Sequence, residues 1–329
     1  METQYDLVVI GTGVAASTVA SRCRSKNWSV AVVDSRPFGG TCPLRGCDPK
    51  KVLLSAAGLV DRYAKASSER IVAPGGLEPS WPELIRFKRT FTDPVPESRE
   101  KSFTDSGIET FHGRARFLDK TTIEVGADRL SAGKILIASG AKPRPLTMPG
   151  AEHVITSADF LELDTLPSRI IFIGGGYVSF ELAHAAARFG AKPTILHRSD
   201  RPLKRFEPDV VGYLIETTRD AGVDVRLETE VKAVNAASDV IEVQAASPGG
   251  DVRLETDLVV HGAGRIPEID DLDLARGGVQ REKGIVVDEY LQSVSNPAVY
   301  AAGDAAQTEG MPLTPITYPT SGSDIHSML

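Results

Sequence analysis

The chain has 329 residues and a formal net charge of −7, from 37 Lys and Arg against 44 Asp and Glu. Its composition, 41% hydrophobic and 25% charged, is that of a globular protein and excludes a mainly disordered chain. No apolar run of about 18 residues predicts a membrane-spanning helix, and the start does not resemble a secretory signal. The acidic balance argues against nucleic-acid binding. We therefore expect a cytoplasmic protein of about two domains, with no nucleic-acid or membrane partner.

The chain begins with a pattern typical of a dinucleotide-binding βαβ unit. A strand, a helix and a second strand are predicted at residues 5–10, 14–24 and 30–33. Gly11, Gly13 and Ala16 occupy the fingerprint positions between strand and helix, where a pyrophosphate meets the helix N-terminus. Asp34 ends the second strand, where a carboxylate can bind a ribose 2′-hydroxyl. The N-terminal segment therefore predicts a dinucleotide site.

The same pattern returns in the middle of the chain. Its strand, helix and second strand are predicted at residues 169–173, 177–189 and 194–196. Its fingerprint positions are Gly174, Gly176 and Ser179. The second strand is followed by His197 instead of an acid, and then by Arg198 and Lys204. Cations without a carboxylate favour the 2′-phosphate of NADP, with NAD as the alternative.

The remaining pattern is less regular. We predict a loop at 74–82, a hairpin or meander at 109–130, and buried strands at 134–139, 258–261 and 298–302. Segments rich in Gly and Pro at 141–150 and 262–267 indicate crossings between domains. Two βαβ units so far apart predict two α/β nucleotide-binding domains.

Two of the three cysteines lie close together. Four residues separate Cys42 from Cys47, so a turn can bring their sulfur atoms into bonding range. In a cytoplasmic protein such a pair is more often redox-active or metal-binding than structural. No histidine lies nearby in the sequence to complete a metal site, so we expect no metal. Cys23, on a predicted helix face, is expected in the core.

The second cysteine of the pair is expected at the start of a helix. Asp48 can cap this helix and Pro49 suits its first turn, and the helix runs to about residue 66. Cys47 then lies at the positive end of the helix dipole, beside Lys50 and Lys51. This environment stabilises a thiolate.

With these motifs in this order, the chain resembles the FAD-dependent pyridine nucleotide–disulfide oxidoreductases, the group of glutathione reductase, dihydrolipoamide dehydrogenase and mercuric reductase. The most specific segment is 39–51, with its Gly-Gly-Thr-Cys and Gly-Cys-x-Pro-Lys elements. The resemblance implies two Rossmann-like, doubly wound domains. A discontinuous domain at 1–150 and 284–315 would bind FAD, and a domain at 151–283 would bind NADPH, with NADH the alternative.

The resemblance also implies catalytic roles. The residues concerned are Cys42, Cys47, Lys50, Lys51, Glu181 and Tyr177. Cys47 resembles the cysteine that faces the flavin as a charge-transfer thiolate, and Cys42 the thiol that attacks the substrate disulfide. Lys50 or Lys51 would be the flavin-side lysine, with Glu181 as its ion-pair partner.

Further positions match cofactor contacts of the family. Those implied for FAD are Gly11, Gly13, Asp34, Gly40, Thr41, Ser139, Gly140, Gly303, Asp304 and Thr314. Those implied for the nicotinamide nucleotide and its domain are Gly174, Gly176, Arg198, Lys204, Gly264 and Arg265. Asp304 would meet the ribityl chain, and Tyr177 would cover the flavin until nicotinamide displaces it.

The C-terminal segment departs from the family pattern. Relatives continue after the Leu-Thr-Pro element, here at 313–315, into an interface domain of about 100 residues that builds the homodimer. That domain also supplies a His–Glu acid/base pair. Here only 316–329 follow; they resemble the end of such a domain, with Tyr318 near the position of the catalytic His. We therefore expect the interface domain to be missing and the chain to be a monomer or a non-standard oligomer.

The implied function is that of an FAD-dependent NAD(P)H:disulfide oxidoreductase. A hydride would pass from NADPH to FAD, then reduce the Cys42–Cys47 disulfide, which would reduce a small-molecule disulfide or another electron acceptor. Without the His–Glu pair, disulfide reduction is expected to be weak. The alternatives are a flavoprotein diaphorase or electron-transfer reductase, and a non-catalytic flavin-binding remnant of a truncated enzyme.

Overall fold

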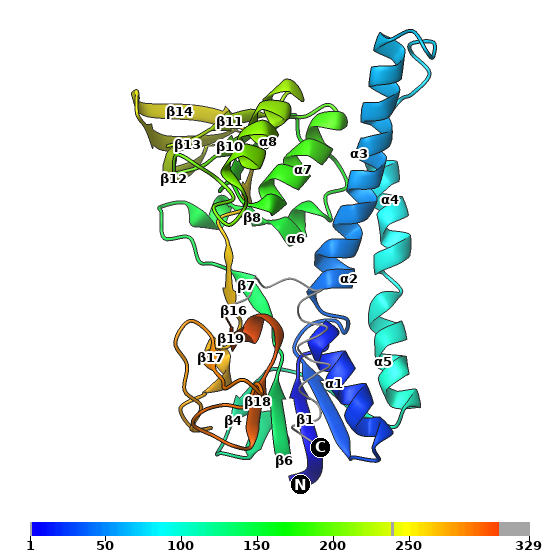
Figure 1. The fold of residues 1–329 in the computed structure, drawn as a ribbon, viewed down its shortest axis with the longest axis vertical. Helices are drawn as coiled ribbons and strands as arrows, with labels where there is room; N and C mark the ends of the chain where they lie inside the picture. Colours follow the sequence, from blue (N-terminus) through cyan, green and yellow to red (C-terminus); the bar gives the residue numbers. More distant parts are fainter. Residues whose placement is uncertain (1, 238–239, 309–329) are drawn as a thin grey trace. The chain divides into compact units, whose positions relative to one another are not determined.

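The computed structural model describes residues 2–237 and 240–308. They form two compact units, each made of separate stretches of chain. The first unit contains 2–44, 92–142 and 265–308, and the second contains 45–91 and 143–264. Each unit is described by itself below, with the labels of Figure 1.

The first unit is an α/β unit built on a mainly parallel sheet. Its strands are β1 (Glu2–Ile10), β2 (Val30–Asp34), β3 (Glu109–His112), β4 (Ala115–Phe117), β5 (Thr122–Val125), β6 (Asp128–Ile137), β7 (Ala141–Pro143), β16 (Arg265–Pro267), β17 (Ile285–Val286), β18 (Val299–Ala301) and β19 (Ala306–Gln307). Its α-helices are α1 (Val14–Ser25), α2 (Thr41–Arg45) and α5 (Val95–Asp105), with 3-10 turns η2 (Asp270–Leu272) and η3 (Gly303–Ala305). The strand order is β3-β2-β1-β6-β5-β4, and β18 pairs with β6 in parallel.

Both faces of this sheet are covered, as a parallel sheet requires. Along β1, Leu7 and Val9 join a core that includes residues of α1, whereas Val8 and Ile10 join the core on the opposite face. None of these four side chains is more than 6% exposed. The strand is therefore a continuous apolar run, which is the pattern of its sequence. The carboxyl ends of β1, β2, β6 and β18 lie at one edge, because these strands are parallel.

The second unit repeats this architecture. Its strands are β8 (Ile155–Thr156), β9 (Arg169–Ile173), β10 (Lys192–Leu196), β11 (Asp224–Arg226), β12 (Glu230–Ala237), β13 (Val240–Ser247), β14 (Gly250–Thr256) and β15 (Leu258–His261). Its helices are α3 (Cys47–Ser68), α4 (Trp81–Thr92, whose last residue belongs to the first unit), α6 (Ser157–Phe160), α7 (Tyr177–Arg188) and α8 (Pro208–Asp220), with the 3-10 turn η1 (Ala151–His153). The parallel sheet has the order β11-β10-β9-β15-β8, and β12-β13-β14 form a separate antiparallel sheet.

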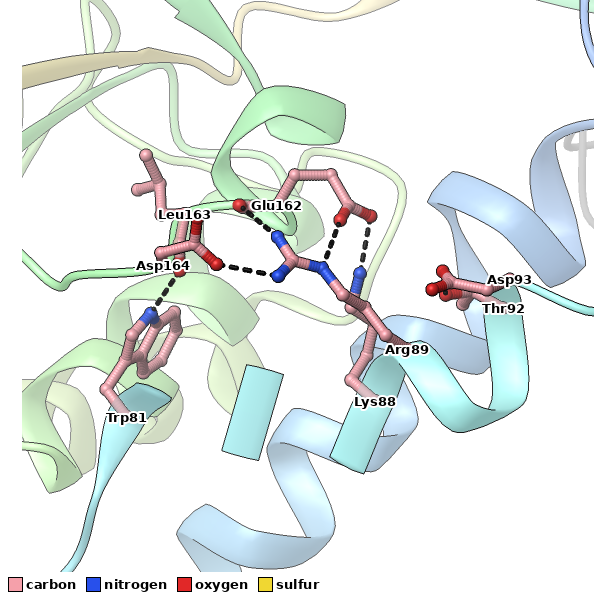
Figure 2. Close-up of polar contacts among 8 residues, drawn as sticks. All are labelled: Trp81, Lys88, Arg89, Thr92, Asp93, Glu162, Leu163 and Asp164. Carbon is pink, nitrogen blue, oxygen red and sulfur yellow. Dashed lines mark hydrogen bonds and ion pairs between the residues drawn. The ribbon is translucent and has the colours of Figure 1, made fainter. Parts of the chain in front are cut away.

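A polar cluster fastens helix α4 to the segment before β9 (Figure 2). The Lys88 side chain is fully buried and pairs with Glu162. Arg89 donates a hydrogen bond to Asp164 over 2.7 Å and also reaches Glu162. The Trp81 indole N–H donates to the carbonyl of Leu163 over 2.8 Å. These contacts satisfy the polar groups of a helix that otherwise packs through apolar side chains.

The fold confirms the α/β prediction with parallel sheets. Its two compact units divide the chain at other positions than the predicted nucleotide-binding domains, which stay predictions. Residues 45–91, expected with the first domain, belong to the second unit, because α3 packs against α7. Residues 265–283, expected in the second domain, belong to the first unit, where Ile269, Leu272 and Leu274 are part of its core. The predicted loop at 74–82 is shorter than expected, since α4 begins at Trp81. Helices α4, α5 and α8 and strands β11–β14 were not predicted.

Candidate functional site

The glycine turn after β1 is closely packed against its neighbours. Gly11 has φ +111°, and a Cβ there would lie 2.3 Å from the carbonyl oxygen of Ala138. Gly40 has φ +76°, and a Cβ there would lie 2.4 Å from the Cα of Gly13. Helix α1 begins directly after Gly13, so its free N-terminal amides lie at this turn. Only glycine allows this close approach of the backbone segments, and a turn of this kind at a helix N-terminus fits a pyrophosphate.

Asp34 is held by the same turn. The Thr12 hydroxyl donates to Asp34 Oδ2 over 2.7 Å, and the Arg36 backbone N–H donates to Asp34 Oδ1 over 3.0 Å. Thr12 is buried and in turn accepts the N–H of Gly39 over 3.1 Å. Each carboxylate oxygen thus keeps a lone pair for a further donor, such as a ribose hydroxyl.

Two more polar groups lie at this edge. The hydroxyl of Ser139, which follows β6, is buried and has no hydrogen-bond partner there. Asp304, which follows β18, lies in η3. Burial raises the pKa of Asp304, while the charge of Arg265 opposes the shift. Buried polar groups without a partner mark a place where a ligand can complete the bonding, so this edge fits FAD.

The two cysteines of the pair belong to consecutive helices. Cys42 lies in the short helix α2, and Cys47 is the first residue of the 22-residue helix α3. Both cysteines are partly exposed. The cap residue of α3 is Gly46 and makes no side-chain capping bond, so the expected Asp48 cap is wrong; Asp48 lies within the first turn. An acid in that turn still complements the helix dipole.

Helix α3 carries one of the two candidate lysines into an ion pair. Lys50 Nζ lies 2.5 Å from Glu181 Oε2 and 4.9 Å from the centre of the Tyr177 ring. Its side chain is only 15% exposed. Lys51, one position further, is exposed. Glu181 and Tyr177 come from the first turns of α7, so the glycine turn after β9 and the start of α3 share one charged cluster.

The glycine turn after β9 is packed as tightly as the first. Gly174 has φ +103°, and a Cβ there would lie 2.5 Å from the carbonyl oxygen of Gly262. The third fingerprint residue, Ser179, is fully buried, and its hydroxyl finds no hydrogen-bond partner in the described part of the chain. Gly176 precedes α7 as its cap residue, without a side-chain capping bond. A helix N-terminus again faces a turn that only small residues can form.

Beyond β10, His197 occupies the position where an acid would select NAD. Its ring is half-buried and hydrogen-bonded to the backbone of Gly175 and Arg201. Burial lowers the pKa of His197, and the charges of Lys204 and Arg198 add to the shift. Arg198 and Lys204 are exposed, and within the described residues neither side chain forms an ion pair or a hydrogen bond. Two cations are therefore available to an anionic ligand.

Comparison with known proteins places this architecture in a family. A family model described as "Pyridine nucleotide-disulphide oxidoreductase" matches residues 5–319. The chain belongs to the pyridine nucleotide–disulfide oxidoreductase family. Members of this family use FAD and NAD(P)H.

Several relatives in the family are similar along most of the chain. It is 35% identical to a mercuric reductase of Streptomyces lividans, over 92% of this chain and 65% of that protein. It is 32% identical to a glutathione reductase of Burkholderia cepacia, over 95% and 68% respectively. The HOCl-induced flavoprotein disulfide reductase RclA of Escherichia coli, solved as a Cu(II) complex, is similar with a TM-score of 0.85 and 25% identity, over 99% of this chain and 70% of RclA. This chain thus spans about two thirds of these oxidoreductases' length.

Within the described residues, the structure places the predicted site residues in two sets. The first unit gathers Gly11, Gly13, Asp34, Gly40, Thr41, Ser139, Gly140, Gly303 and Asp304 around the loops that follow its strands. The second unit gathers Lys50, Tyr177 and Glu181 in one cluster, and Gly174, Gly176, Arg198 and Lys204 around its own loops. The chain passes from one unit to the other between Cys42 and Cys47 and between Gly264 and Arg265. Thr314 and Tyr318 lie outside the described residues.

Two features of the structure were not expected as site elements. The ring of His197 braces the second glycine turn, although the sequence suggested only that an acid is absent there. Arg36 pairs with Glu268, and so ties the loop after Asp34 to the segment whose Glu268 N–H donates to the carbonyl of Gly140 over 2.9 Å. No sequence signal connects positions so far apart.

Other expectations concern the surroundings of the site. Cys23 is confirmed in the core, where burial raises the pKa of its thiol to about 11. Among the described residues, no cluster of His, Cys, Asp or Glu is arranged to hold a metal ion. None of the described helices is long and apolar enough to cross a lipid bilayer.

Proposed function

We propose that the chain acts as an FAD-dependent NADPH:disulfide oxidoreductase whose redox disulfide is formed by Cys42 and Cys47. The first unit would hold FAD and the second unit NADPH. The net reaction is NADPH + H⁺ + disulfide → NADP⁺ + two thiols, so two electrons and two protons are balanced. FAD, when bound, carries the two electrons from the nicotinamide to the cysteine pair.

The residues of the first unit are proposed to bind and orient FAD. The amides after Gly13 would receive the pyrophosphate, and the Asp34 carboxylate would accept a ribose hydroxyl. Ser139 and Asp304 would bond the ligand's polar groups, and the ligand would give the Ser139 hydroxyl the partner that it lacks among the described residues.

One observation carries the proposal furthest, namely the charged cluster one turn along α3 from Cys47. Lys50 follows Cys47 by three positions, so both side chains lie on one face of the helix. The ion pair with Glu181 holds the Lys50 ammonium in a defined place, one turn along the helix from Cys47. We propose that Cys47 is the thiolate that faces FAD, and that Cys42 exchanges with the substrate disulfide.

The coenzyme preference is proposed from Arg198 and Lys204. They are cations without an ion-pair partner in the described residues, and they follow a strand that ends without an acid. The chemistry fits a 2′-phosphate better than a ribose 2′-hydroxyl. The acceptor is proposed to be a small disulfide. The names of the relatives suggest which acceptors to test. These are glutathione disulfide and lipoamide, with Hg(II) as a metal-ion alternative.

The test is a thiol count on the FAD-loaded protein under anaerobic conditions. We expect NADPH to release two thiols per chain that were not titratable before, together with a long-wavelength absorption band. Both signals should vanish in Cys47→Ser, and Cys42→Ser should release no additional thiol. Cys23→Ser is the matched control, since Cys23 is buried in the core and should leave the gain of two thiols unchanged.

Three other outcomes would contradict the proposal. Flavin bleaching by NADPH with no new thiols would support a diaphorase or electron-transfer reductase. Failure to bind FAD would support a non-catalytic remnant. Equal bleaching rates with NADH and NADPH would remove the coenzyme assignment but leave the disulfide chemistry in place.

A further inference from the structure

The His197 side chain connects two loops of the second unit through both ring nitrogens. The backbone N–H of Gly175 donates to Nδ1 over 3.1 Å, and Nε2 lies 3.0 Å from the carbonyl oxygen of Arg201. A peptide N–H can only donate and a carbonyl can only accept, so the ring is neutral with its proton on Nε2. The lowered pKa of His197 agrees with this state.

The ring of His197 packs closely against the glycine turn. A Cβ on Gly175 would lie 3.0 Å from Cγ and Nδ1 of His197 and 2.7 Å from Cβ of Pro202. The His197 backbone is fixed as well, because its N–H donates to Arg226 over 2.9 Å and its carbonyl accepts the N–H of Thr229 over 2.8 Å. The glycine turn, the ring and the following loop therefore form one packed layer.

The loop that the ring fastens is the one that carries the two cations. Arg201, whose carbonyl His197 binds, donates through its guanidinium to the carbonyl of Lys204 over 3.2 Å. Between them, Leu203 has φ +49°, a left-handed conformation that a branched side chain adopts only when its surroundings enforce it. The loop of residues 198–204 is thus connected to the turn at Gly175 through Arg201, which in turn contacts Lys204.

The charge of the side chain at position 197 affects how well the loop can bind an anionic ligand. A carboxylate at position 197 could accept the N–H of Gly175 equally well, but it would add negative charge beside Arg198 and Lys204. A neutral imidazole accepts the same N–H without that charge.

We propose that His197 is a positioning residue for coenzyme selection, which fixes the loop of Arg198 and Lys204 against the turn 174–176. The pyrophosphate at the turn and the 2′-phosphate at the loop would then be bound at a fixed separation. This inference rests on the proposed NADPH function and adds to it the residue that sets the preference.

The experiment compares NADP⁺ with NAD⁺, which carries the same pyrophosphate and lacks only the 2′-phosphate, by calorimetric titration of the FAD-loaded protein. The wild type should prefer NADP⁺. In His197→Ala the preference, expressed as the ratio of the two dissociation constants, should fall about tenfold, the usual effect of losing a hydrogen-bonded position. In His197→Gln part of the preference should return, because an amide N–H can replace Nε2–H as a donor to Arg201. His153→Ala, an exposed histidine of the same unit, should change nothing.

The outcomes separate the inference from the function on which it rests. A wild type without preference for NADP⁺ over NAD⁺ would overturn the NADPH assignment and the inference together. A wild-type preference that persists in His197→Ala would overturn the inference alone. Equal weakening for both ligands would show that the ring only supports the fold, and would also overturn it. A ¹⁵N-detected spectrum of the ring gives an independent reading, since a protonated Nδ1 at neutral pH contradicts the bond from Gly175.

Discussion

The Ser179 hydroxyl occupies the space in which a side chain on residue 262 would begin. A Cβ on Gly262 would lie 1.9 Å from Ser179 Oγ, and 3.2 Å from the carbonyl oxygen of Ile173. Ser179 is the third residue of the second fingerprint, and Gly262 follows the neighbouring strand β15. The two positions therefore constrain each other: the larger residue on the helix requires the smaller one on the loop.

This relationship predicts a compensating pair of substitutions. Gly262→Ala should lower the free energy of unfolding by about 1–3 kcal/mol, because it overpacks a filled site. Ser179→Ala should be nearly neutral, since the hydroxyl is buried without a hydrogen bond in the described structure. The double variant should recover most of the loss in urea unfolding. Gly212→Ala, in the open on α8, is the control and should not destabilise. Additive effects would contradict the contact.

The glycine turns show what the sequence could predict. Each follows an apolar strand and precedes a helix, so local pattern alone located Gly11, Gly174 and the carboxyl-end edge of each sheet. The choice between Lys50 and Lys51 could not be predicted in this way. It depends on the rotation of α3 against α7, which is a tertiary property, and the structure pairs Lys50 with Glu181.

The missed elements have a related explanation. Helices α4 and α5 have Pro82 and Pro96 within their first turns, where proline is tolerated, so a proline-rich stretch concealed helix starts. Strands β12–β14 form a partly exposed antiparallel sheet. Apolar and small residues alternate only weakly along these strands, so the sequence gives little sign of them. The hydrogen bond between Gly175 and His197 joins positions 22 residues apart, and no sequence pattern predicts it.

The buried lysine of α3 gives a prediction for the proposed reaction. Lys50→Met should slow the NADPH-driven release of thiols about tenfold or more. The substitution removes a fixed positive charge one turn along α3, the helix that starts at Cys47. Glu181→Gln should have a smaller effect in the same direction. Lys51→Met is the matched control, since this neighbour is exposed and should retain the wild-type rate in stopped-flow measurements. If Lys51→Met were the slower variant, the assignment would be reversed.

A histidine network predicts how stability depends on pH. The guanidinium of Arg188 donates to His184 Nδ1 over 2.8 Å, and His184 Nε2 donates to the Thr218 hydroxyl over 2.9 Å. Arg188 also donates to Asp61 over 3.1 Å, so the network joins α3, α7 and α8. Burial and the charge of Arg188 lower the pKa of His184 from 6.5 to about 4. The ring is therefore neutral in the folded protein at pH 6.

The lowered pKa of His184 sets the direction of the pH effect. As the pH falls, the unfolded chain takes up the proton at His184 before the folded chain does. The contribution of His184 to the free energy of unfolding is therefore complete above pH 6.5 and is lost as the pH falls to about 4. The loss is at most about 3 kcal/mol. His184→Gln keeps an N–H donor for Thr218 but does not titrate, so its unfolding free energy should fall less between pH 7 and 4.5. Wild-type pH dependence in His184→Gln would refute the assignment, and His153→Gln is the exposed control.

The cluster in Figure 2 predicts an order of effects for its buried ion pair. Lys88 is fully buried, whereas Glu162 is 48% exposed. Glu162→Gln leaves the buried Lys88 ammonium without its counter-charge and should lower the free energy of unfolding by about 1–3 kcal/mol. This loss is smaller than for a fully buried ion pair, because Glu162 is half exposed. Lys88→Met keeps the volume of the side chain and leaves a solvated carboxylate next to Arg89, so it should cost less.

Urea unfolding of both variants and of Lys88→Met/Glu162→Gln measures this order. The double variant should resemble Lys88→Met alone, because the remaining pair of Glu162 with Arg89 is partly exposed and contributes less than about 1 kcal/mol. Glu83→Gln breaks an exposed pair with Arg86 on the same helix and should cost less than about 1 kcal/mol. A larger loss for Lys88→Met than for Glu162→Gln would mean that the lysine methylenes, rather than its paired charge, hold α4 in place.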